Sequence, residues 1–167
     1  MTLAERLLEA ARAGGARIAT AESCTGGMVA AAITDVAGAS DIYAAGFITY
    51  ANEAKVRDLN VRPATLAAHG AVSEPVAREM AEGALARAEA TLAVAVTGIA
   101  GPGGSAHKPE GRVCFGLAAR GRPTQSETVE FGAAGRARVR AAARDHALRL
   151  LLGALGAPAQ ARAEDGR

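Results

Sequence analysis

Two candidate nucleophiles and a pair of glycines occur together in residues 20–27, which read TAESCTGG. The nucleophiles, Ser23 and Cys24, come directly after a short apolar run that predicts a buried strand. A turn from a strand into a helix exposes side chains at a sheet edge, and its backbone N–H groups stabilise an anion or a developing oxyanion. The segment therefore indicates either amide chemistry or phosphate binding.

A second glycine-rich turn, TGIAGPGG at residues 97–104, follows the most strand-like run of the chain. In an open α/β sheet, loops at the carboxyl ends of the strands form the ligand crevice, so both turns are expected to converge there. Gly98 and Gly101 then allow close backbone approach, and Thr97 offers a hydroxyl to the substrate. Neither turn has the lysine of a Walker A loop or the Gly-x-Gly-x-x-Gly spacing of a dinucleotide site. The sequence therefore predicts neither ATP nor NAD as a cofactor.

The composition indicates one layered α/β domain. The chain has 167 residues, of which 50% are hydrophobic and 3% aromatic, a balance that favours closely packed helices and aliphatic strands. The formal charge is +2, and the arginines are dispersed without interleaved aromatic residues, which indicates no nucleic-acid partner. The two cysteines have no ligand or disulfide spacing, and no run is long and apolar enough to span a membrane. A soluble cytoplasmic protein with reduced thiols and no bound metal is expected.

The elements that must position these residues are predicted from apolar spacing and turn residues. Asn52 and Ser73 are the predicted N-caps of two helices. The last two strands flank residues 121–123 and form a hairpin, which adds antiparallel pairing to a βα order. Residues 1–155 are expected to form a single domain, and residues 156–167 a flexible tail. Helices are expected over 3–14, 25–36, 63–69, 73–88 and 136–155, together with one that opens at Asn52 and carries Lys55 and Leu59, and strands over 18–21, 44–50, 91–97, 112–120 and 124–131.

Four segments, taken in order along the chain, resemble the CinA carboxy-terminal domain family, the nicotinamide-nucleotide amidases. They are TAESCTGG at 20–27, GFITYANEAK at 46–55, HGAVSEP at 69–75 and TGIAGPGG at 97–104. The resemblance implies an α/β fold, a three-layer α/β/α sandwich whose mixed, mainly parallel sheet includes a C-terminal β-hairpin. It also implies hydrolysis of nicotinamide mononucleotide to nicotinic acid mononucleotide and ammonia in pyridine nucleotide salvage. A serine aided by a lysine would perform this reaction without a metal or another cofactor.

Ser23 and Lys55 match the serine and the lysine of the family. A serine hydroxyl is too weakly acidic to attack at neutral pH, so a base must accept its proton. Lys55 is expected just after a buried strand and early in a helix, where desolvation and the helix N-terminus would disfavour its ammonium form. The alternative is a solvated helix lysine, and the match to the family favours the base.

Three neighbours of this pair receive different assignments. Tyr50 is expected to hydrogen-bond the pair or the substrate through its phenol, in line with the family. Glu22 is grouped with the substrate-binding residues as a supporting carboxylate that pairs with a cation or caps a helix. Cys24 is the rival nucleophile, but none of the three histidines stands in a recognisable partner motif. Thr25, Gly26 and Gly27 are expected to supply the oxyanion-side backbone.

Arg136 and Arg140 are four residues apart at the start of the last predicted helix, so they share a face and could grip a phosphate. A solvated cationic face is the alternative, since Arg138 and Arg144 lie nearby. Family members typically begin this helix with Gly-Asp-Arg, whereas residues 134–136 read AGR. Arg136 is therefore matched without the acidic neighbour, which leaves its orientation open.

A non-catalytic nucleotide-binding or interaction module of the competence/damage-inducible CinA type is the competing hypothesis, and it predicts that the nucleotide binds unchanged. The joint presence of Ser23, Tyr50 and Lys55 favours the enzyme, because a binding module needs no groups for proton transfer. A homo-oligomer is expected from the resemblance and from the alanine-rich helix faces. The expected partners are a small nucleotide and further copies of the chain, with no nucleic acid and no membrane.

Overall fold

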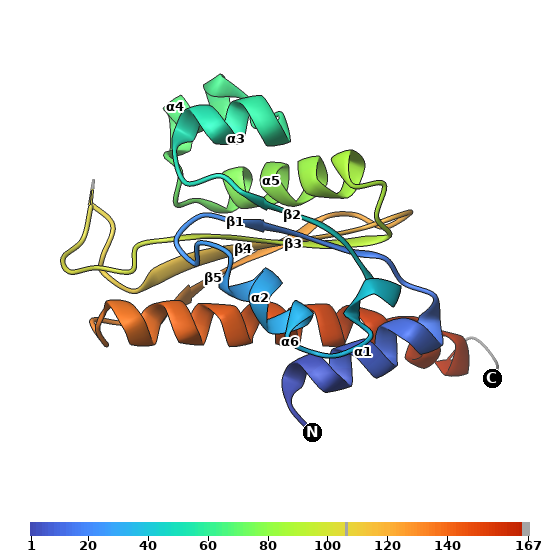
Figure 1. The fold of residues 1–167 in the computed structure, drawn as a ribbon. Helices are drawn as coiled ribbons and strands as arrows, with labels where there is room; N and C mark the ends of the chain where they lie inside the picture. The colour runs from blue at the N-terminus through green and yellow to red at the C-terminus, as the bar shows by residue number, and fades with distance from the viewer. Residues whose placement is uncertain (106, 165–167) are drawn as a thin grey trace.

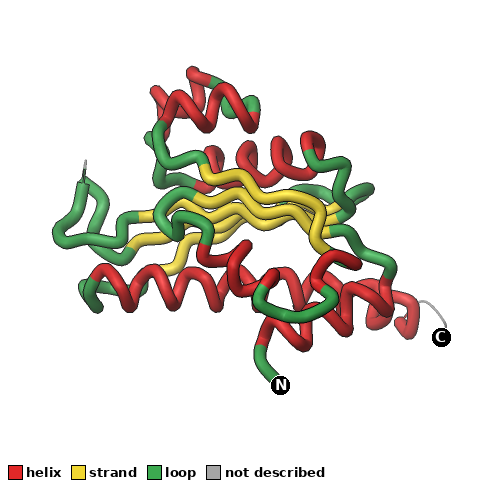
Figure 2. Tube along the Cα trace, in the orientation of Figure 1, coloured by secondary structure: helices red, strands yellow, loops and turns green. Residues whose placement is uncertain are grey.

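The structure, a computed structural model, describes residues 1–105 and 107–164, with side chains up to residue 156. Five strands form one sheet between two layers of helices (Figures 1 and 2). The strands are β1 (Ile18–Glu22), β2 (Tyr43–Ile48), β3 (Leu92–Gly98), β4 (Arg112–Ala119) and β5 (Gln125–Glu130). The helices are α1 (Leu3–Gly14), α2 (Met28–Thr34), α3 (Asn52–Leu59), α4 (Pro63–His69), α5 (Glu74–Arg87) and α6 (Arg136–Glu164), with a 3-10 turn η1 (Ala39–Asp41).

The sheet has the strand order β2-β1-β3-β4-β5. β1 pairs in parallel with both β2 and β3, whereas β4 is antiparallel to β3 and to β5. Four strands therefore run in one direction and only β4 opposes them. The predicted α/β fold, with a mixed and mainly parallel sheet and a C-terminal hairpin, is confirmed.

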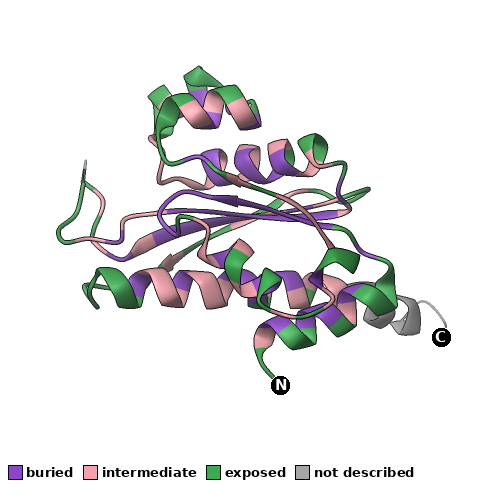
Figure 3. Ribbon diagram, in the orientation of Figure 1, coloured by how far each residue is buried: buried purple, intermediate pink, exposed green. Residues whose placement is uncertain are grey.

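Successive side chains of β3 point to opposite faces of the sheet, and this divides the core into two halves. Leu92, Val94 and Val96 pack against apolar residues of α1, α2 and α6. Ala93 and Ala95 face the other way and pack against α5 and the end of α3. Figure 3 shows the result, because the strands are mostly buried and the helices expose the faces that point away from the sheet. This alternation produces the three layers.

Small residues let α5 lie close to the sheet. A Cβ atom at Gly116 in β4 would collide with the backbone carbonyl of Ala77 in α5. The buried face of α5 is rich in alanine, with Ala77, Ala81 and Ala84 fully buried. The close approach follows from the low aromatic and high alanine content of the sequence.

Several helix ends differ from the predictions. α2 begins at Met28 rather than Thr25, because Gly26 and Gly27 have left-handed φ values of 58° and 103° and cannot continue a helix. Asn52 is the first residue of α3 and not its N-cap, whereas Ser73 caps α5 as predicted and accepts from Val76 N. α6 continues past residue 155 to Glu164 through an alanine-rich segment, and the rest of the predicted tail, 165–167, lies outside the described residues.

Candidate active site

The carboxyl ends of the three parallel strands meet at one end of the sheet. Ser23 directly follows β1, and its backbone N–H donates to Val96 O of β3 at 2.9 Å. Thr49 directly follows β2, and its N–H donates to Glu22 O of β1 at 2.9 Å. The strand ends are therefore tied to one another, and the predicted convergence of residues 20–27 with the end of β3 is present.

Ser23 and Lys55 are in contact across 32 residues of sequence. Lys55 Nζ lies 3.1 Å from Ser23 Oγ, 2.7 Å from Thr49 O and 3.1 Å from Tyr50 O. Lys55 lies in the first turn of α3, but only 1% of its surface is exposed. The structure therefore does not place Lys55 as a solvated helix lysine.

Burial lowers the pKa of Lys55 from its ordinary value of 10.5 to about 8. A neutral amine has two N–H donors and one lone pair, and the two carbonyls of Thr49 and Tyr50 match the two donors. The lone pair is then left for the hydroxyl proton of Ser23. The two backbone carbonyls thus hold the amine beside the serine hydroxyl, a role that residue types do not signal in the sequence.

Cys24 differs from Ser23 in its environment. Its side chain belongs to the buried core cluster on the side of α2 and α6. Burial raises the pKa of the thiol to about 11, so the reactive thiolate is scarce at neutral pH. The geometry therefore favours Ser23 over Cys24 as the attacking group.

Glu22 is occupied by the start of α2. Its carboxylate oxygens accept from Val29 N at 2.9 Å and Ala30 N at 3.1 Å, and the residue is buried. The structure therefore places this carboxylate as a cap of α2, which is the helix-capping alternative of the prediction. It holds α2 against the turn that carries Ser23.

Thr25 is fully buried, and within the described part of the chain its hydroxyl has no hydrogen-bond partner. The same is true of the Thr49 hydroxyl. The predicted contact of Thr25 with a substrate therefore stays a prediction. Gly26 and Gly27 continue the turn with positive φ, which only glycine adopts without strain.

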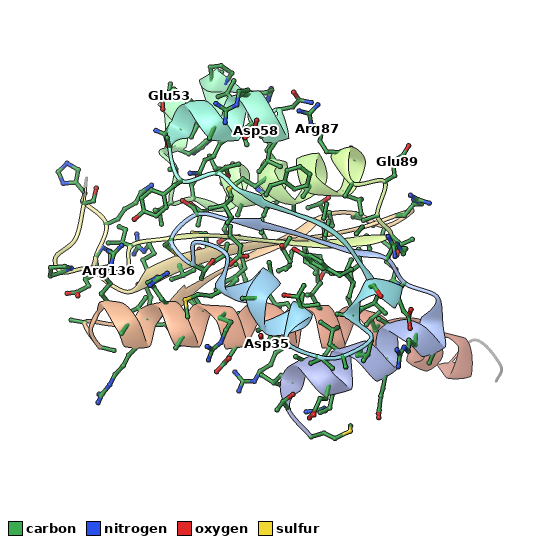
Figure 4. All side chains as sticks on the ribbon, viewed as in Figure 1. Asp35, Glu53, Asp58, Arg87, Glu89 and Arg136 are labelled. Atoms are coloured by element: carbon green, nitrogen blue, oxygen red, sulfur yellow. The ribbon has the colours of Figure 1, made fainter. Side chains whose placement is uncertain are left out.

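Arg136 connects Tyr50 with the loop after β3. Its Nη2 donates to Tyr50 Oη at 3.1 Å and its Nη1 donates to Gly101 O at 2.8 Å. Figure 4 shows Arg136 at the end of the molecule where this loop lies. Tyr50 is 61% exposed, so its phenol and Arg136 form a polar rim beside the buried pair.

Arg140 is also at the site, but it has different partners. Its Nε donates to Cys24 O at 3.0 Å and its Nη2 donates to Thr25 O at 3.3 Å. The two arginines share a helix face, as predicted, yet they do not form one fork around a single anion position. Nothing in the sequence signals a guanidinium bonded to backbone carbonyls.

The end of β3 and the following loop serve packing in this structure. Thr97 is buried and donates to Ala71 O at 2.9 Å, so its hydroxyl is used by the segment before α5. A Cβ atom at Gly98 would lie 2.7 Å from Val113 Cγ2, and one at Gly101 would collide with the Glu110 carboxylate. Lys108 Nζ fastens the same loop to His69 O and Val72 O, both at 2.6 Å, an anchoring that sequence reasoning missed.

Cofactor and membrane features can be described for residues 1–105 and 107–164. Among the described side chains, those of residues 1–105 and 107–156, no three from His, Cys, Asp or Glu are grouped as metal ligands. No helix within residues 1–105 and 107–164 has both the length and the apolar character to cross a bilayer.

The fold and the site define an α/β protein with a serine and a buried lysine at the carboxyl ends of parallel strands. The chain belongs to the CinA C-terminal domain family, whose model matches residues 1–155. The crystal structure of the competence/damage inducible protein CihA from Agrobacterium tumefaciens is similar, with a TM-score of 0.88 and 46% identity. That match covers 92% of this chain and 93% of the other.

Two curated relatives differ in length. The nicotinamide-nucleotide amidohydrolase PncC of Escherichia coli (strain K12) is 58% identical over 123 residues, which cover 72% of this chain and 74% of that protein. The CinA-like protein of Chlorobaculum tepidum is 57% identical over 104 residues, which cover 62% of this chain but 25% of that protein. The chain thus matches about a quarter of the longer relative.

Proposed function

We propose that this chain is an amidohydrolase that converts nicotinamide mononucleotide to nicotinic acid mononucleotide and ammonia. The observation that carries the proposal is the 3.1 Å contact between Ser23 Oγ and the buried Lys55 Nζ. The name of the Escherichia coli relative, which is 58% identical, supports the substrate. A buried amine with a pKa of about 8 is suited to accept a serine proton near neutral pH.

Acylation begins when Lys55 Nζ accepts the hydroxyl proton and Ser23 Oγ attacks the carboxamide carbon. The carbonyl oxygen becomes an oxyanion in the tetrahedral intermediate. Lys55 then returns the proton to the amide nitrogen, the C–N bond breaks and ammonia leaves. The product of this half-reaction is an ester between the nicotinoyl group and Ser23, with Lys55 again neutral.

Deacylation repeats these steps with water as the nucleophile. Lys55 Nζ accepts a proton from water while the water oxygen attacks the ester carbon. Lys55 then returns the proton to Ser23 Oγ as the ester bond breaks. One water is consumed, the acid product ionises in solution, and Ser23 and Lys55 regain their starting states.

Backbone N–H groups of the turn after Ser23 are the proposed oxyanion donors. The N–H groups of Ser23 and Gly26 are already bonded, to Val96 O and to Ser23 O. Those of Cys24, Thr25 and Gly27 have no backbone acceptor among the described residues. A free donor at this turn stabilises the negative charge only when the intermediate forms.

The phosphate of the nucleotide is assigned to Arg136. Its guanidinium is exposed and lies on the polar rim with Tyr50, beside the buried pair. Charge-assisted hydrogen bonds from a guanidinium suit a phosphate. Tyr50 and Arg136 would thus bind the nucleotide while Ser23 and Lys55 perform the chemistry.

The proposed reaction is tested by ammonia release from nicotinamide mononucleotide by the purified protein. Turnover with formation of nicotinic acid mononucleotide is expected, at the same rate with and without a metal chelator, because no step uses a metal ion. Binding of the nucleotide without any turnover would refute the proposed enzyme and support a binding module instead.

The place in metabolism follows from the same proposal. An enzyme that converts the amide nucleotide to the acid nucleotide serves pyridine nucleotide salvage. We place it in the cytoplasm, where thiols stay reduced, because Cys24 and Cys114 are both free thiols in the structure.

We further infer that the chain forms a homo-oligomer through the free edge of β2. This edge strand has no charged residue, and Ile48 at its end is 57% exposed. The opposite edge, β5, carries Glu127 and Glu130, which discourage pairing. Arg17 is bonded to Ser40 O just before β2, and the exposed Glu53 follows β2, so antiparallel pairing of two copies brings opposite charges together.

Light scattering after size exclusion tests this interface. The unchanged protein is expected to have the mass of a dimer or a higher oligomer, and Ile48→Lys is expected to shift it toward the monomer because charge blocks edge pairing. Gln125→Lys on the exposed β5 edge is the matched control and leaves the mass unchanged. A monomeric unchanged protein, or an equal shift in both variants, would contradict the assignment.

A further inference from the structure

Arg140 joins the last helix to the turn that carries the proposed nucleophile. We infer that Arg140 is a positioning residue that fixes the orientation of the oxyanion-binding backbone at Cys24 and Thr25, an inference that rests on the proposed amidohydrolase function. Its guanidinium donates to the carbonyl oxygens of both residues, at 3.0 Å and 3.3 Å, from 116 and 115 positions away in sequence. This assignment replaces the predicted phosphate contact of Arg140.

The peptide plane explains how a carbonyl contact orients a donor. In a trans peptide, the C=O of one residue and the N–H of the next point in opposite directions. Because Arg140 binds Cys24 O, the N–H of Thr25 must point away from the guanidinium. Within the described part of the chain, this N–H has no backbone acceptor, so it remains a free donor two residues after Ser23.

The turn needs such an anchor because it is rich in glycine. Gly26 and Gly27 have φ values of 58° and 103°, and peptides beside glycine rotate at little steric cost. A Cβ atom at Gly26 would lie 3.4 Å from Arg140 Nη2, so the guanidinium packs directly against the turn. A rotation of these peptides would replace a donor by a carbonyl oxygen, which repels the oxyanion.

The chemistry of the guanidinium fits this role better than it fits a phosphate. Nε and Nη2 of Arg140 are bonded to successive carbonyl oxygens of one turn, and Arg140 is partly buried. Arg136 is exposed and divides its donors between the Tyr50 phenol and one loop carbonyl. A planar fork reaches two successive carbonyls with fixed geometry, which a lysine ammonium does not reproduce. A cation on a carbonyl also polarises the peptide and strengthens its N–H as a donor.

Turnover and nucleotide binding separate the two roles. Arg140→Gln is expected to lower kcat about 10²-fold, the loss typical of one oxyanion donor, and Arg140→Lys is expected to fall between this variant and the unchanged protein. The Kd for nicotinamide mononucleotide, measured by calorimetry in the Ser23→Ala background, is expected to change less than about threefold. Arg136→Gln is the matched control, with an expected rise in Kd of about tenfold or more.

A phosphate role for Arg140 would give the opposite pattern, with a raised Kd in Arg140→Gln and a kcat that stays near that of the unchanged protein. This result would overturn the inference. If thermal unfolding shows that Arg140→Gln does not fold, the kcat and Kd of Arg140→Lys decide in the same way. Failure of the proposed function is recognised separately, because the unchanged protein would then be inactive or Ser23→Ala would remain active.

Discussion

Replacement of Ser23 by alanine is expected to lower kcat for ammonia release by at least about 10³-fold. Without Oγ no ester intermediate forms, and Lys55 has no hydroxyl from which to accept a proton. The nucleotide should still bind, because the polar rim of Tyr50 and Arg136 is unchanged. The measurement is steady-state ammonia release together with the Kd of the variant.

Cys24→Ala is the matched control, since it removes the other nucleophile one residue away. The buried thiol has a pKa of about 11, so fewer than about one molecule in a thousand carries a thiolate at pH 7 to 8. We expect its kcat to stay within about threefold of the unchanged protein. Alanine is preferred to serine because it adds no new hydroxyl. A dead Cys24→Ala beside an active Ser23→Ala would assign the attack to the thiol.

Local patterns predicted the parts of the site that depend on strand ends. Ser23 and the segment after Ile48 follow apolar runs, and parallel strands must bring such segments to the same end of the sheet. The contact between Ser23 and Lys55 was therefore within reach of sequence reasoning. The burial that gives the lysine its lowered pKa was expected from its place after a strand, although most helix lysines are exposed.

Local sequence patterns could not predict contacts that depend on where distant segments of the chain lie. Arg140 reaches Cys24 O because Val139 and Ala143 dock α6 against the sheet, and the local sequence shows that this face is apolar but not which distant turn it meets. Glu22 binds the start of α2 because the two glycines delay that helix until Met28. In both cases the partner is a backbone group, and sequence types carry no signal for backbone partners.

Lys55→Met is expected to lower kcat by about 10³-fold, because Lys55 Nζ is the one group hydrogen-bonded to Ser23 Oγ in the described part of the chain. In the unchanged protein, kcat/KM is expected to rise with pH through a midpoint near 8, since only the neutral amine accepts a proton. At pH 7 about one molecule in ten has the neutral amine, so the rise to the plateau is roughly tenfold. Rates from pH 6.5 to 9.5 measure this profile, and a flat profile would exclude Lys55 as the base.

The same pKa affects stability with a defined sign. The lysine keeps its proton up to pH 10.5 in the unfolded chain but loses it near pH 8 in the folded one. Between these values the unfolded state binds more protons, so the free energy of unfolding increases with pH. Relative to Lys55→Met, the unchanged protein should gain about 2 kcal/mol between pH 7 and pH 9.5, as measured by urea unfolding. All other titrating groups are shared by the two proteins. If the difference between their free energies of unfolding stays constant with pH, the folded lysine keeps its ordinary pKa and is protonated near neutral pH, where it could not act as the proposed base.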